Sequence, residues 1–438
     1  MASLRAWAKT DVGKKRKQNE DALLVDESLG LYVVCDGMGG HAAGEVASAT
    51  AAATIQKVVA GEKSVIARFA AQDTPENRDA LVMLMERAIE TACAEIFRIS
   101  SRESDKRGMG TTCVALITAG KKAVLGHVGD SRIYLVRNNR AHQLTEDHTL
   151  VQDQLKRGVI TAAQAAKSSV RNVITRAVGL QPSVAVDTLI TDLMPGDAYV
   201  LCSDGLHGYL EDGELPVLAG VAPREMLCDQ LVEMANERGG KDNVTVVVVA
   251  VEGEDGEEST NVEAKMELLH GVPLFEHMTY KELLSIIGAA RAHRFEVGTQ
   301  IIREGEQGDA LFILFGGRAE VLRGGSVIAT LEAGAHFGEM GLLDQVPRSA
   351  TVRVVDPVSA IAIDRETLLK LLRKDSVLSV KLLWSLAQVL SERLRATSGA
   401  LASVKGDLDK LGSTTAKAAF DVIGEERIAP PPPPKGGE

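Results

Sequence analysis

The 438-residue sequence contains few aromatic residues, which make up 3% of it, and only five cysteines. With so few aromatic rings, the hydrophobic cores must be built from Val, Leu, Ile and Ala. The cysteines are scattered and odd in number, and four of them lie in apolar runs. This pattern predicts buried free thiols rather than a disulfide framework, and therefore a cytoplasmic protein.

Long apolar runs and clustered positive charge are also missing. No stretch approaches the roughly 18 apolar residues that suggest a membrane span. Residues 1–15 contain no apolar core of a secretory signal. The net charge is −11, whereas nucleic-acid binding needs clustered Lys and Arg. We therefore expect neither a membrane nor a nucleic acid as a partner.

The length predicts more than one domain, because single cores stop growing near 250–300 residues. Residues 1–252 mix short Val/Ile-rich segments, bounded by Gly, Asp or Asn, with Ala-rich helical segments. Strands in hairpin-like succession with helices grouped between them predict an α+β fold of layered sheets and helices. Residues 253–264 are acidic and have little to bury, so we expect a linker there.

The remainder of the chain predicts a second domain and a tail. Residues 265–397 contain short helical segments, then strands punctuated by Gly, then amphipathic helices. This order is typical of a small β-barrel or jelly roll with flanking helices. Residues 398–438 are polar, rich in Gly and Ala, and end in a proline run. We expect a flexible tail there, acting either as a docking peptide or only as a solubilising segment.

Four short turns in the N-terminal domain each place an aspartate beside a glycine or asparagine at the end of an apolar run. They contain Asp36, Asp130, Asp204 and Asp242, and a fifth acidic pair is Glu20–Asp21. Any one of these turns alone is ordinary turn chemistry. Together, and without matching Cys/His pairs, they predict one oxygen-lined pocket for hard divalent cations.

Such a pocket has a definite chemistry. Water held between two cations loses a proton near neutral pH and becomes a nucleophile. Arg16 lies four residues before Glu20, and a guanidinium fork matches two oxygens of a phosphate. The pattern therefore predicts metal-assisted hydrolysis of a phosphomonoester. Taken by itself, Arg16 belongs to a Lys/Arg run, for which a solvated surface is the default interpretation.

The motifs around these residues occur in the order RKQNED, VVCDGMGGHAAGE, GMGTT, HVGDSRIY, LTEDHT, RNVITRAVG, SDGL and KDNVT. In type and order they resemble the bacterial metal-dependent protein phosphatases of type 2C. The resemblance implies an α/β/β/α sandwich, in which two antiparallel sheets pack face to face and helices cover both outer faces. It also implies that the substrates are phosphoserine and phosphothreonine proteins, the products of a cognate Ser/Thr kinase.

The resemblance further implies roles for individual residues. Two Mn²⁺ or Mg²⁺ ions are held by Glu20, Asp36, the carbonyl of Gly37, Asp204 and Asp242. Arg16 grips the substrate phosphate, and Asp21 supports the metal-bound waters. Asp130 joins Asp204 around a third, weaker metal.

Some neighbouring positions depart from the family pattern or have other interpretations. Some animal members carry a proposed general-acid His directly after the Asp-Gly turn, where this chain has Met38. His41 lies nearby, but we do not assign it that role, because a metal-bound water can protonate the leaving group. His127 and His148 fit hydrogen-bonded structural histidines better than ligands. Residues 156–175 resemble the mobile flap of the family, although a plain helix and loop fits equally well.

The second domain contains GTQIIREGEQGDALFILFGGRAEV and HFGEMGLLDQVPRSATV. Gly338 and Glu339 follow a Gly-rich strand, and Arg348, Ser349 and Ala350 open the next strand after a short helical turn. Backbone amides at a helix start can cradle a phosphate, with Arg348 to neutralise it and Glu339 to bind a ribose hydroxyl. These motifs resemble cyclic nucleotide-binding domains. The resemblance implies a cyclic nucleotide effector, and we favour cyclic AMP over cyclic GMP.

Alternatives remain for both domains. The barrel fits a domain that no longer binds a ligand, and the first domain fits a non-catalytic signalling adaptor that responds to cyclic nucleotide. No DNA recognition helix follows the C-terminal helices, which disfavours a transcription factor. One apolar stripe there fits core packing better than a homodimer seam, which stays open: Leu382, Leu383, Leu386, Val389, Leu390 and Leu394. The sequence thus predicts a metal-dependent Ser/Thr phosphatase regulated by a cyclic nucleotide.

Overall fold

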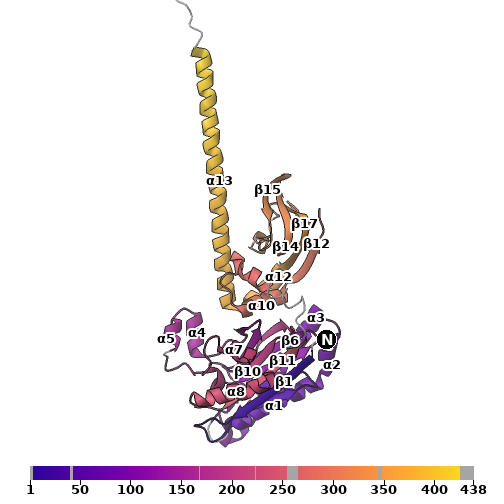
Figure 1. Ribbon diagram of the computed structural model, residues 1–438, viewed down its shortest axis with the longest axis vertical. Coiled ribbons are helices and arrows are strands. Elements are labelled where there is room, and N and C mark those ends of the chain that lie inside the picture. The colour runs from indigo at the N-terminus through magenta and orange to yellow at the C-terminus, as the bar shows by residue number, and fades with distance from the viewer. Residues whose placement is uncertain are drawn as a thin grey trace, which may run out of the picture.

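The computed structural model describes residues 3–39, 43–166, 168–221, 223–253, 265–343 and 347–424. Two sheets at the N-terminal end, a third sheet and a long C-terminal helix make up the chain (Figure 1). Most of the predicted linker, the whole proline run and His41 lie outside the described residues. None of the described helices is both long and apolar enough to cross a bilayer.

The N-terminal domain is built on two antiparallel sheets. In spatial order, the first contains β1 (Ser3–Asp11), β11 (Val244–Glu252), β10 (Ala198–Cys202), β7 (Arg132–Arg137) and β8 (Arg140–Gln143). The second contains β2 (Asp21–Asp26), β3 (Leu31–Met38), β5 (Cys113–Ala119), β6 (Lys122–Val128) and β9 (Asp187–Asp192), with β4 (Gly110–Thr111) beside β3.

Helices connect these strands and cover the sheets. They are α1 (Ala43–Gly61), α2 (Lys63–Ala71), α3 (Pro75–Arg102), the 3₁₀ turn η1 (Ser104–Lys106), α4 (Leu150–Lys156), α5 (Ala162–Ala166), α6 (Asp204–His207), α7 (Glu214–Val221) and α8 (Arg224–Glu237). The residues before α3 explain why this helix begins where it does. Thr74 caps it by accepting a hydrogen bond from the Asn77 amide, and Pro75 takes the first helical position, where no amide donor is needed.

The central strand β11 shows why the layers stack as they do. Alternate residues of a strand point to opposite faces, so its valine run is buried on both sides. Val247 and Val249 join the core between the two sheets, whereas Val246 and Val248 pack with Leu231 of α8. On the other side, α1 and α3 cover the outer face of the second sheet. The predicted α/β/β/α sandwich is confirmed, and all five cysteines are buried free thiols.

The second domain begins with helical turns over 265–270, η2 (Pro273–Phe275) and α10 (Tyr280–Ala289). Its antiparallel strands are β12 (Arg291–Phe295), β13 (Gln300–Ile302), β14 (Ala310–Arg323), β15 (Ser326–Leu331), β16 (His336–Phe337) and β17 (Thr351–Asp364). The long strands β14 and β17 pair through three register shifts. The sheet encloses a small core that includes Leu314, Phe337 and Val352, as a β-barrel domain requires. The last helices are α11 (Met340–Leu343), α12 (Arg365–Lys374) and α13 (Ser376–Gly424).

The two domains share one continuous hydrophobic core. It runs from the inner faces of the N-terminal sheets to Leu283 and Ile286 of α10. At its edge the Tyr280 ring stacks on His142, with 3.6 Å between ring centroids. Arg137, which forms a buried ion pair with Asp197, donates a 3.3 Å hydrogen bond to the Tyr280 hydroxyl. The second domain is therefore packed against β8 and β9 and not merely tethered by a linker.

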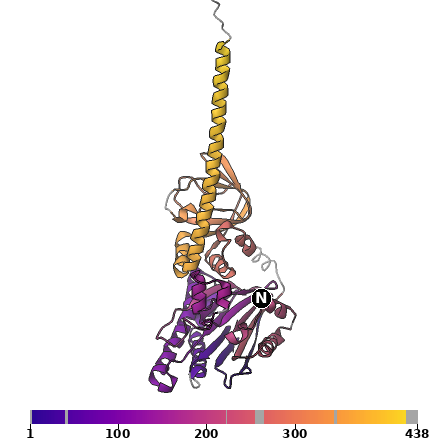
Figure 2. The ribbon, with the colours of Figure 1, turned by 90° about the vertical axis from the view of Figure 1, so that its left-hand side faces the viewer.

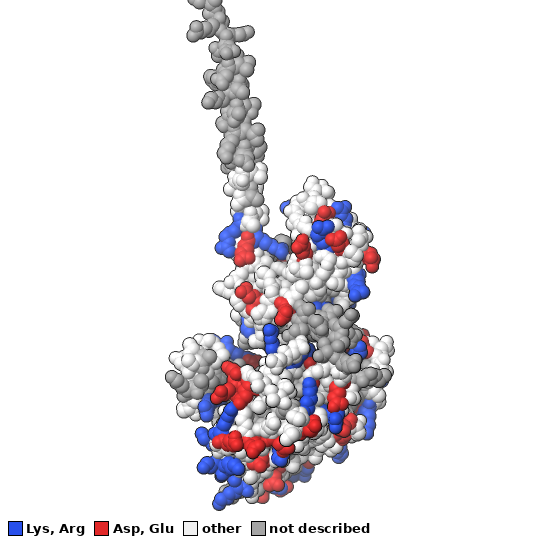
Figure 3. All heavy atoms as spheres, viewed as in Figure 1, with Lys and Arg blue, Asp and Glu red and all other residues white. Residues whose placement is uncertain are grey.

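The structure differs from the predicted tail at α13, which continues helical to Gly424, so residues 398–424 are helix. Four glycines lower the helix propensity there, but apolar residues recur at helical spacing and no proline interrupts. The helix rises alone beyond the second domain (Figures 1 and 2). Its described surface above that domain is largely uncharged, whereas acidic and basic side chains are interspersed over both domains (Figure 3).

Leu382, Leu386 and Val389 of the predicted apolar stripe are buried in the shared core. Core packing is therefore confirmed for these three. Leu383 and Leu394, by contrast, are 52% and 68% exposed, so these two side chains do not belong to that core.

Candidate metal centre and second pocket

The predicted acidic residues, except Asp21, meet in one cavity of about 470 Å³. They come from five segments far apart in the sequence: the β1–β2 loop, the end of β3, the β6–β7 turn, the start of α6 and the turn before β11. The predicted residues that line the cavity are Arg16, Glu20, Asp36, Gly37, Asp130, Asp204 and Asp242. Met38 also lines it, and His41 lies outside the described residues.

Backbone and hydroxyl contacts fix Asp36 at the end of β3. Its amide donates to Thr112 Oγ1 at 3.0 Å. Its carbonyl accepts from the Thr111 hydroxyl and the Thr112 amide, both at 2.9 Å. The next residue must be Gly37, because a Cβ there would lie 2.2 Å from the carbonyl oxygen of Gly44. The sequence motifs did not reveal this supporting role of the two threonines.

Asn243 holds the loop that carries Glu20. Its Oδ1 accepts a hydrogen bond from the Glu20 amide at 2.9 Å. Its Nδ2 donates to the carbonyls of Val12 and Gln18 at 3.0 and 2.9 Å. Sequence reasoning missed this residue, although it directly follows the predicted ligand Asp242.

Asp21 lies behind the cavity and not in its wall. It pairs with Asp36 across β2 and β3, and its Oδ2 accepts a 2.8 Å hydrogen bond from the Ser203 hydroxyl. Its Oδ1 is buried and has no partner among the described residues. Burial raises the pKa of this carboxyl to about 7. An acceptor oxygen is thus available just behind the acidic cluster.

The cavity concentrates negative charge with little to balance it. Burial and then the neighbouring carboxylates raise the pKa of Asp36 well above its ordinary range. Burial, followed by Asp204, raises the pKa of Asp130 to about 7. Among the described lining residues Arg16 alone is cationic, with its Nη2 2.7 Å from Asp242 Oδ2. Oxygen ligands with unbalanced charge fit hard divalent cations such as Mn²⁺ or Mg²⁺.

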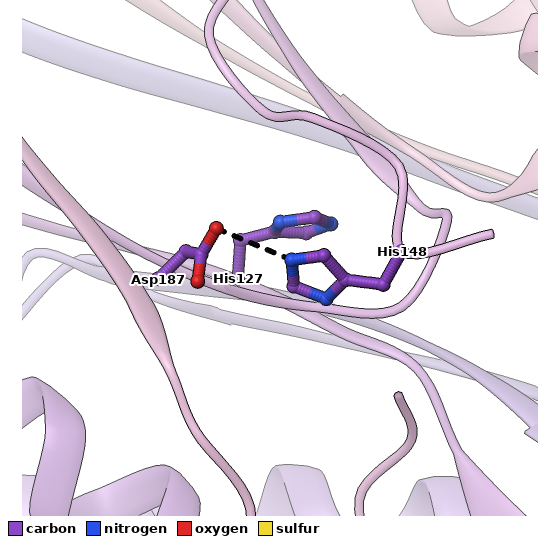
Figure 4. A group of neighbouring side chains, drawn as sticks. All are labelled: His127, His148 and Asp187. Carbon is purple, nitrogen blue, oxygen red and sulfur yellow. Dashed lines mark hydrogen bonds and ion pairs between the residues drawn. The ribbon is translucent and has the colours of Figure 1, made fainter. Parts of the chain in front are cut away.

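A second cluster of side chains that could bind a metal lies beside the β6–β7 turn: His127, His148 and Asp187 (Figure 4). His148 accepts a hydrogen bond from the Gly129 amide at Nδ1, and its Nε2 lies 3.2 Å from Asp187 Oδ2. The prediction of a hydrogen-bonded structural histidine is confirmed for His148. It is wrong for His127, which is 2% exposed and whose ring nitrogens have no hydrogen-bond partner among the described residues. His127 instead packs its ring against His148.

The predicted flap segment contains the end of α4, then α5, then turns. Asn172 and Ile174 reach the metal cavity. Arg171 and Asn172 also line an adjoining cavity of about 510 Å³, together with Lys241 and with Asp130, Asp204 and Asp242 of the acidic cluster. The segment therefore forms one side of a groove that leads to the acidic residues.

The second domain contains a pocket of about 850 Å³ inside the curled sheet. Its wall includes all five predicted binding residues: Gly338, Glu339, Arg348, Ser349 and Ala350. Arg348 donates to the carbonyls of Gly338 and Ala310 at 3.0 and 2.9 Å. Its Nε and Glu339 Oε2 are buried without partners among the described residues. A buried unpaired donor and a buried unpaired acceptor fit a ligand with an anionic group and hydroxyls.

Helix α13 contributes to the same pocket through Arg393, Ala396 and Thr397. Arg393 forms an ion pair with Glu339 Oε1 and a 3.2 Å hydrogen bond to the His336 carbonyl. Sequence reasoning did not assign these residues to the site, because nothing local in the helix indicates which part of the barrel it meets.

We predict that the metal-free protein becomes more stable as the pH is lowered from 8 to 7. The pKa values of Asp21 and Asp130 are raised to about 7 in the folded protein, against about 3.9 in an unfolded chain. The folded state therefore binds protons more tightly in this window, and this stabilisation is lost as the pH rises through 7. Thermal unfolding of EDTA-treated protein, followed by calorimetry, measures the effect.

Two comparisons sharpen this test. The Asp130→Asn variant should show a smaller rise in melting temperature, because one titrating carboxyl is removed. Saturating Mn²⁺ should weaken or reverse the rise, because the cation displaces the same protons. A melting temperature that falls from pH 8 to pH 7 in the metal-free protein would contradict the electrostatic description of the cavity.

The chain is similar to known proteins over both domains. The family model described as "Protein phosphatase 2C" matches residues 13–245. The model described as "Cyclic nucleotide-binding domain" matches residues 292–375. The first match covers more than half of the chain, and it contains every predicted metal ligand.

Individual relatives agree with the family match. The serine/threonine phosphatase stp of Listeria monocytogenes is 36% identical over 250 residues, which cover 56% of this chain and 95% of the relative. PstP of Mycobacterium tuberculosis is 36% identical over 251 residues, 57% of this chain and 45% of the relative. The crystal structure of Mycobacterium tuberculosis PstP/Ppp superposes with a TM-score of 0.51 at 34% identity, covering 58% of this chain and all of that one. The chain belongs to the protein phosphatase 2C family, with a Ser/Thr phosphatase domain followed by a cyclic nucleotide-binding domain.

Proposed function

We propose that the N-terminal domain hydrolyses phosphoserine and phosphothreonine in cytoplasmic phosphoproteins, with two Mn²⁺ or Mg²⁺ ions as cofactors. The observation that carries this proposal is the convergence of acidic residues from five distant segments, with Arg16, in one cavity. The catalytic domain of a serine/threonine protein phosphatase named PstP has a structure described as a complex with two manganese ions. This chain matches it at 33% identity with a TM-score of 0.50. That likeness supports a similar centre here.

The proposed roles follow from the position of each residue. The two ions would be held by the four side chains of Glu20, Asp36, Asp204 and Asp242 and by the Gly37 carbonyl. A third, weaker ion would lie between Asp130 and Asp204. When bound, the ions supply a nucleophilic water near neutral pH and offset the charge of the phosphate.

Side chains around that centre would bind the substrate and position the water. Arg16 stands at the cavity wall with 47% of its side chain exposed, so its guanidinium can bind two phosphate oxygens and orient the ester. Asp21 presents a buried oxygen without a partner among the described residues, which suits an acceptor for a water of the centre. The adjoining cavity beside the flap segment, of about 510 Å³, would receive the polypeptide on which the phosphate is carried.

We predict Mn²⁺-dependent hydrolysis of p-nitrophenyl phosphate and of a phosphothreonine peptide by the full chain. Loss of an outer hydrogen-bond partner in a metal site commonly costs 10–100-fold, so Asp204→Asn should lower kcat/KM by more than about 100-fold. Arg16→Ala removes a charged hydrogen bond of about 1.5–3 kcal/mol, roughly 10–100-fold in kcat/KM, and Lys17→Ala is the matched control. An Asp204→Asn protein as active as its parent would refute the centre. No Mn²⁺-dependent activity in a folded parent would favour the alternative, a non-catalytic adaptor.

We further propose that a cyclic nucleotide, with cyclic AMP favoured over cyclic GMP, binds the second pocket and changes the phosphatase activity. The unpaired Nε of Arg348 suits the cyclic phosphate, and Glu339 suits a ribose hydroxyl. Arg393 of α13 already occupies one oxygen of Glu339. A nucleotide that binds Glu339 must therefore share or displace Arg393, so binding and the position of α13 depend on each other.

Contacts among the described residues lead from α13 to the phosphatase domain. Lys381 of α13 binds both carboxylate oxygens of Glu282 in α10, at 2.9 and 2.8 Å. Tyr280, at the start of α10, stacks on His142 of β8. A shift of α13 would thus displace the edge of the first sheet at β8, two strands from β10, the strand that precedes Asp204.

We predict that cyclic AMP binds the full chain in isothermal titration and changes its Mn²⁺-dependent turnover, with cyclic GMP tested in parallel. Arg348→Gln should abolish measurable binding, because it removes the charge that meets the phosphate. Arg353→Gln is the control, since Arg353 lies five residues further on, in β17, and pairs with Glu320 at the surface. If neither nucleotide gives heat at millimolar concentration, the pocket is no longer a binding site. If binding leaves turnover unchanged, the proposed regulation fails.

We also propose that two chains associate along the outer part of α13. Its exposed apolar residues follow a seven-residue repeat, in which positions a and d form a two-stranded seam. The described members in the outer part of the helix are Leu394, Leu401 and Val404, between 57% and 68% exposed. The sequence continues the repeat with Leu408 and Leu411. This seam uses a different face of the helix from the buried Leu382, Leu386 and Val389.

We predict a mass near twice 46.6 kDa for the full chain in sedimentation equilibrium. Replacing Leu401 and Val404 together by Glu should give the monomer mass, because like charges would face each other across the seam. Ser403→Glu adds charge between them but lies off the seam, so this control should stay dimeric. A parent protein that sediments as a monomer at about 100 μM would contradict the seam.

A further inference from the structure

We propose that His148 is a positioning residue for the metal centre: through two hydrogen bonds to Gly129 it fixes the turn that carries Asp130. This inference rests on the proposed role of Asp130 as a ligand of the third, weaker ion. His148 itself does not line the metal cavity. Its influence runs through the backbone between β6 and β7.

The two hydrogen bonds join the same pair of residues. The His148 amide donates to the Gly129 carbonyl at 2.8 Å. The Gly129 amide donates to His148 Nδ1 at 3.1 Å. Gly129 has φ +107, and a Cβ on it would lie 2.7 Å from Thr112. Only glycine suits this backbone, and glycine gives the turn no stiffness of its own, so the turn depends on partners outside it.

A single tautomer of His148 makes this possible (Figure 4). Because Nδ1 accepts from Gly129, the neutral ring must carry its hydrogen at Nε2. That nitrogen lies 3.2 Å from Asp187 Oδ2, which accepts the hydrogen. Arg176 binds the other oxygen of Asp187 at 2.7 Å and so orients the carboxylate. Asp187 thereby selects the form of His148 that can hold Gly129.

The same tautomer excludes an alternative role for this cluster. The ligand atoms of His127, His148 and Asp187 lie within 4.8 Å of one another, a spacing that would suit a cation. With hydrogen on Nε2 and a donor at Nδ1, however, His148 has no lone pair free for a metal. The cluster therefore acts through hydrogen bonds, and the buried His127 ring packs against the plane of His148.

A second histidine holds the other side of the turn. His207 Nε2 donates to the Asp130 carbonyl at 2.9 Å. The Gly129–Asp130 segment is thus gripped at three backbone atoms. Asp130 is 6% exposed and lies near Asp204. Loss of one of these hydrogen bonds would therefore displace its carboxylate, which is too tightly packed to return by a change of rotamer.

Two substitutions at one position separate the two contacts of His148. In His148→Asn the amide oxygen takes the place of Nδ1 and can still accept from Gly129, but nothing reaches Asp187. In His148→Gln the amide nitrogen takes the place of Nε2 and can still donate to Asp187, but the acceptor for Gly129 is lost. A purely structural role in the core would not distinguish these variants in this direction.

The measurement is Mn²⁺ binding to the metal-depleted full chain, with free Mn²⁺ counted by electron paramagnetic resonance. We expect His148→Gln to weaken the weakest Mn²⁺ equivalent by about 10–100-fold, the usual effect of losing an outer hydrogen-bond partner. His148→Asn should stay within about 3-fold of the parent, by the same principle. Melting temperatures of the metal-free proteins show whether both variants fold.

Asp130→Asn separates failure of this inference from failure of the metal assignment. If Asp130→Asn loses the weak Mn²⁺ equivalent but His148→Gln does not, the positioning role is overturned. If His148→Asn is impaired as much as His148→Gln, it is overturned as well, because the Asp187 contact would then be the one that matters. If Asp130→Asn binds Mn²⁺ like the parent, the assignment of Asp130 as a ligand falls and this inference with it.

A measurement on the unmutated protein covers the case in which the variants do not fold. With ¹⁵N-labelled histidine, two-bond correlation spectra distinguish the two neutral tautomers and the charged ring. We expect His148 to be neutral with hydrogen on Nε2 at pH 7.5. A ring with hydrogen on Nδ1, or a charged ring, cannot accept from the Gly129 amide and would overturn the proposal.

Discussion

The mutual repulsion of carboxylates at one end of the sandwich is the constraint on which the rest of the structure depends. Five segments deliver acidic side chains to one cavity, and among its described lining residues only Arg16 opposes their charge. Burial raises the pKa of Asp36 and Asp204, which shows that the folded chain holds these groups in an unfavourable state without cations. The free energy that holds them there comes from the apolar layers. Strands such as β11 are buried on both faces, and each strand end places its turn at a fixed point. The framework is therefore apolar and rigid, whereas neutralising the carboxylates in the cavity at its end requires cations.

This division explains how much of the site the sequence could predict. The proposed ligands Asp36 and Asp204 lie at the end of an apolar strand or just after one, so residue type and local pattern mark them directly. The order of those turns also predicted the layered fold. Supporting residues carry no such local signature. Asn243 holds the Glu20 backbone across 223 positions of sequence, and Thr112 meets Asp36 across 76. Such partners are defined by which strands pair, and a hydrophobic pattern specifies that a strand is buried without specifying its neighbour.

The regions where prediction and structure differ have similar physical causes. Residues 398–424 contain four glycines and few large side chains, which suggested a flexible tail, yet α13 continues through them. Helix propensity is a weak prior, and the heptad spacing of the apolar residues is the stronger signal. The two domains likewise looked independent in sequence because an acidic segment separates them. In the structure their apolar faces form one core, since α10 covers β8 and β9. Composition locates a boundary in the chain but does not show whether surfaces on either side are complementary.

Helix α13 contacts both the second pocket and α10, so it links the ligand pocket to the phosphatase domain. Near its start, Lys381 is tied to Glu282 of α10, and three turns later Arg393 is tied to Glu339 in the second pocket. A helix transmits displacement along its axis because its backbone hydrogen bonds make it stiff. A ligand that competes for Glu339 therefore acts on the same rigid body that presses α10 against the phosphatase sheets. Coupling of this kind requires a helix with two positions of comparable free energy. Under the proposed regulation the Arg393–Glu339 contact would supply the difference between them, because a ligand at the free Oε2 would share the carboxylate that Arg393 holds at Oε1.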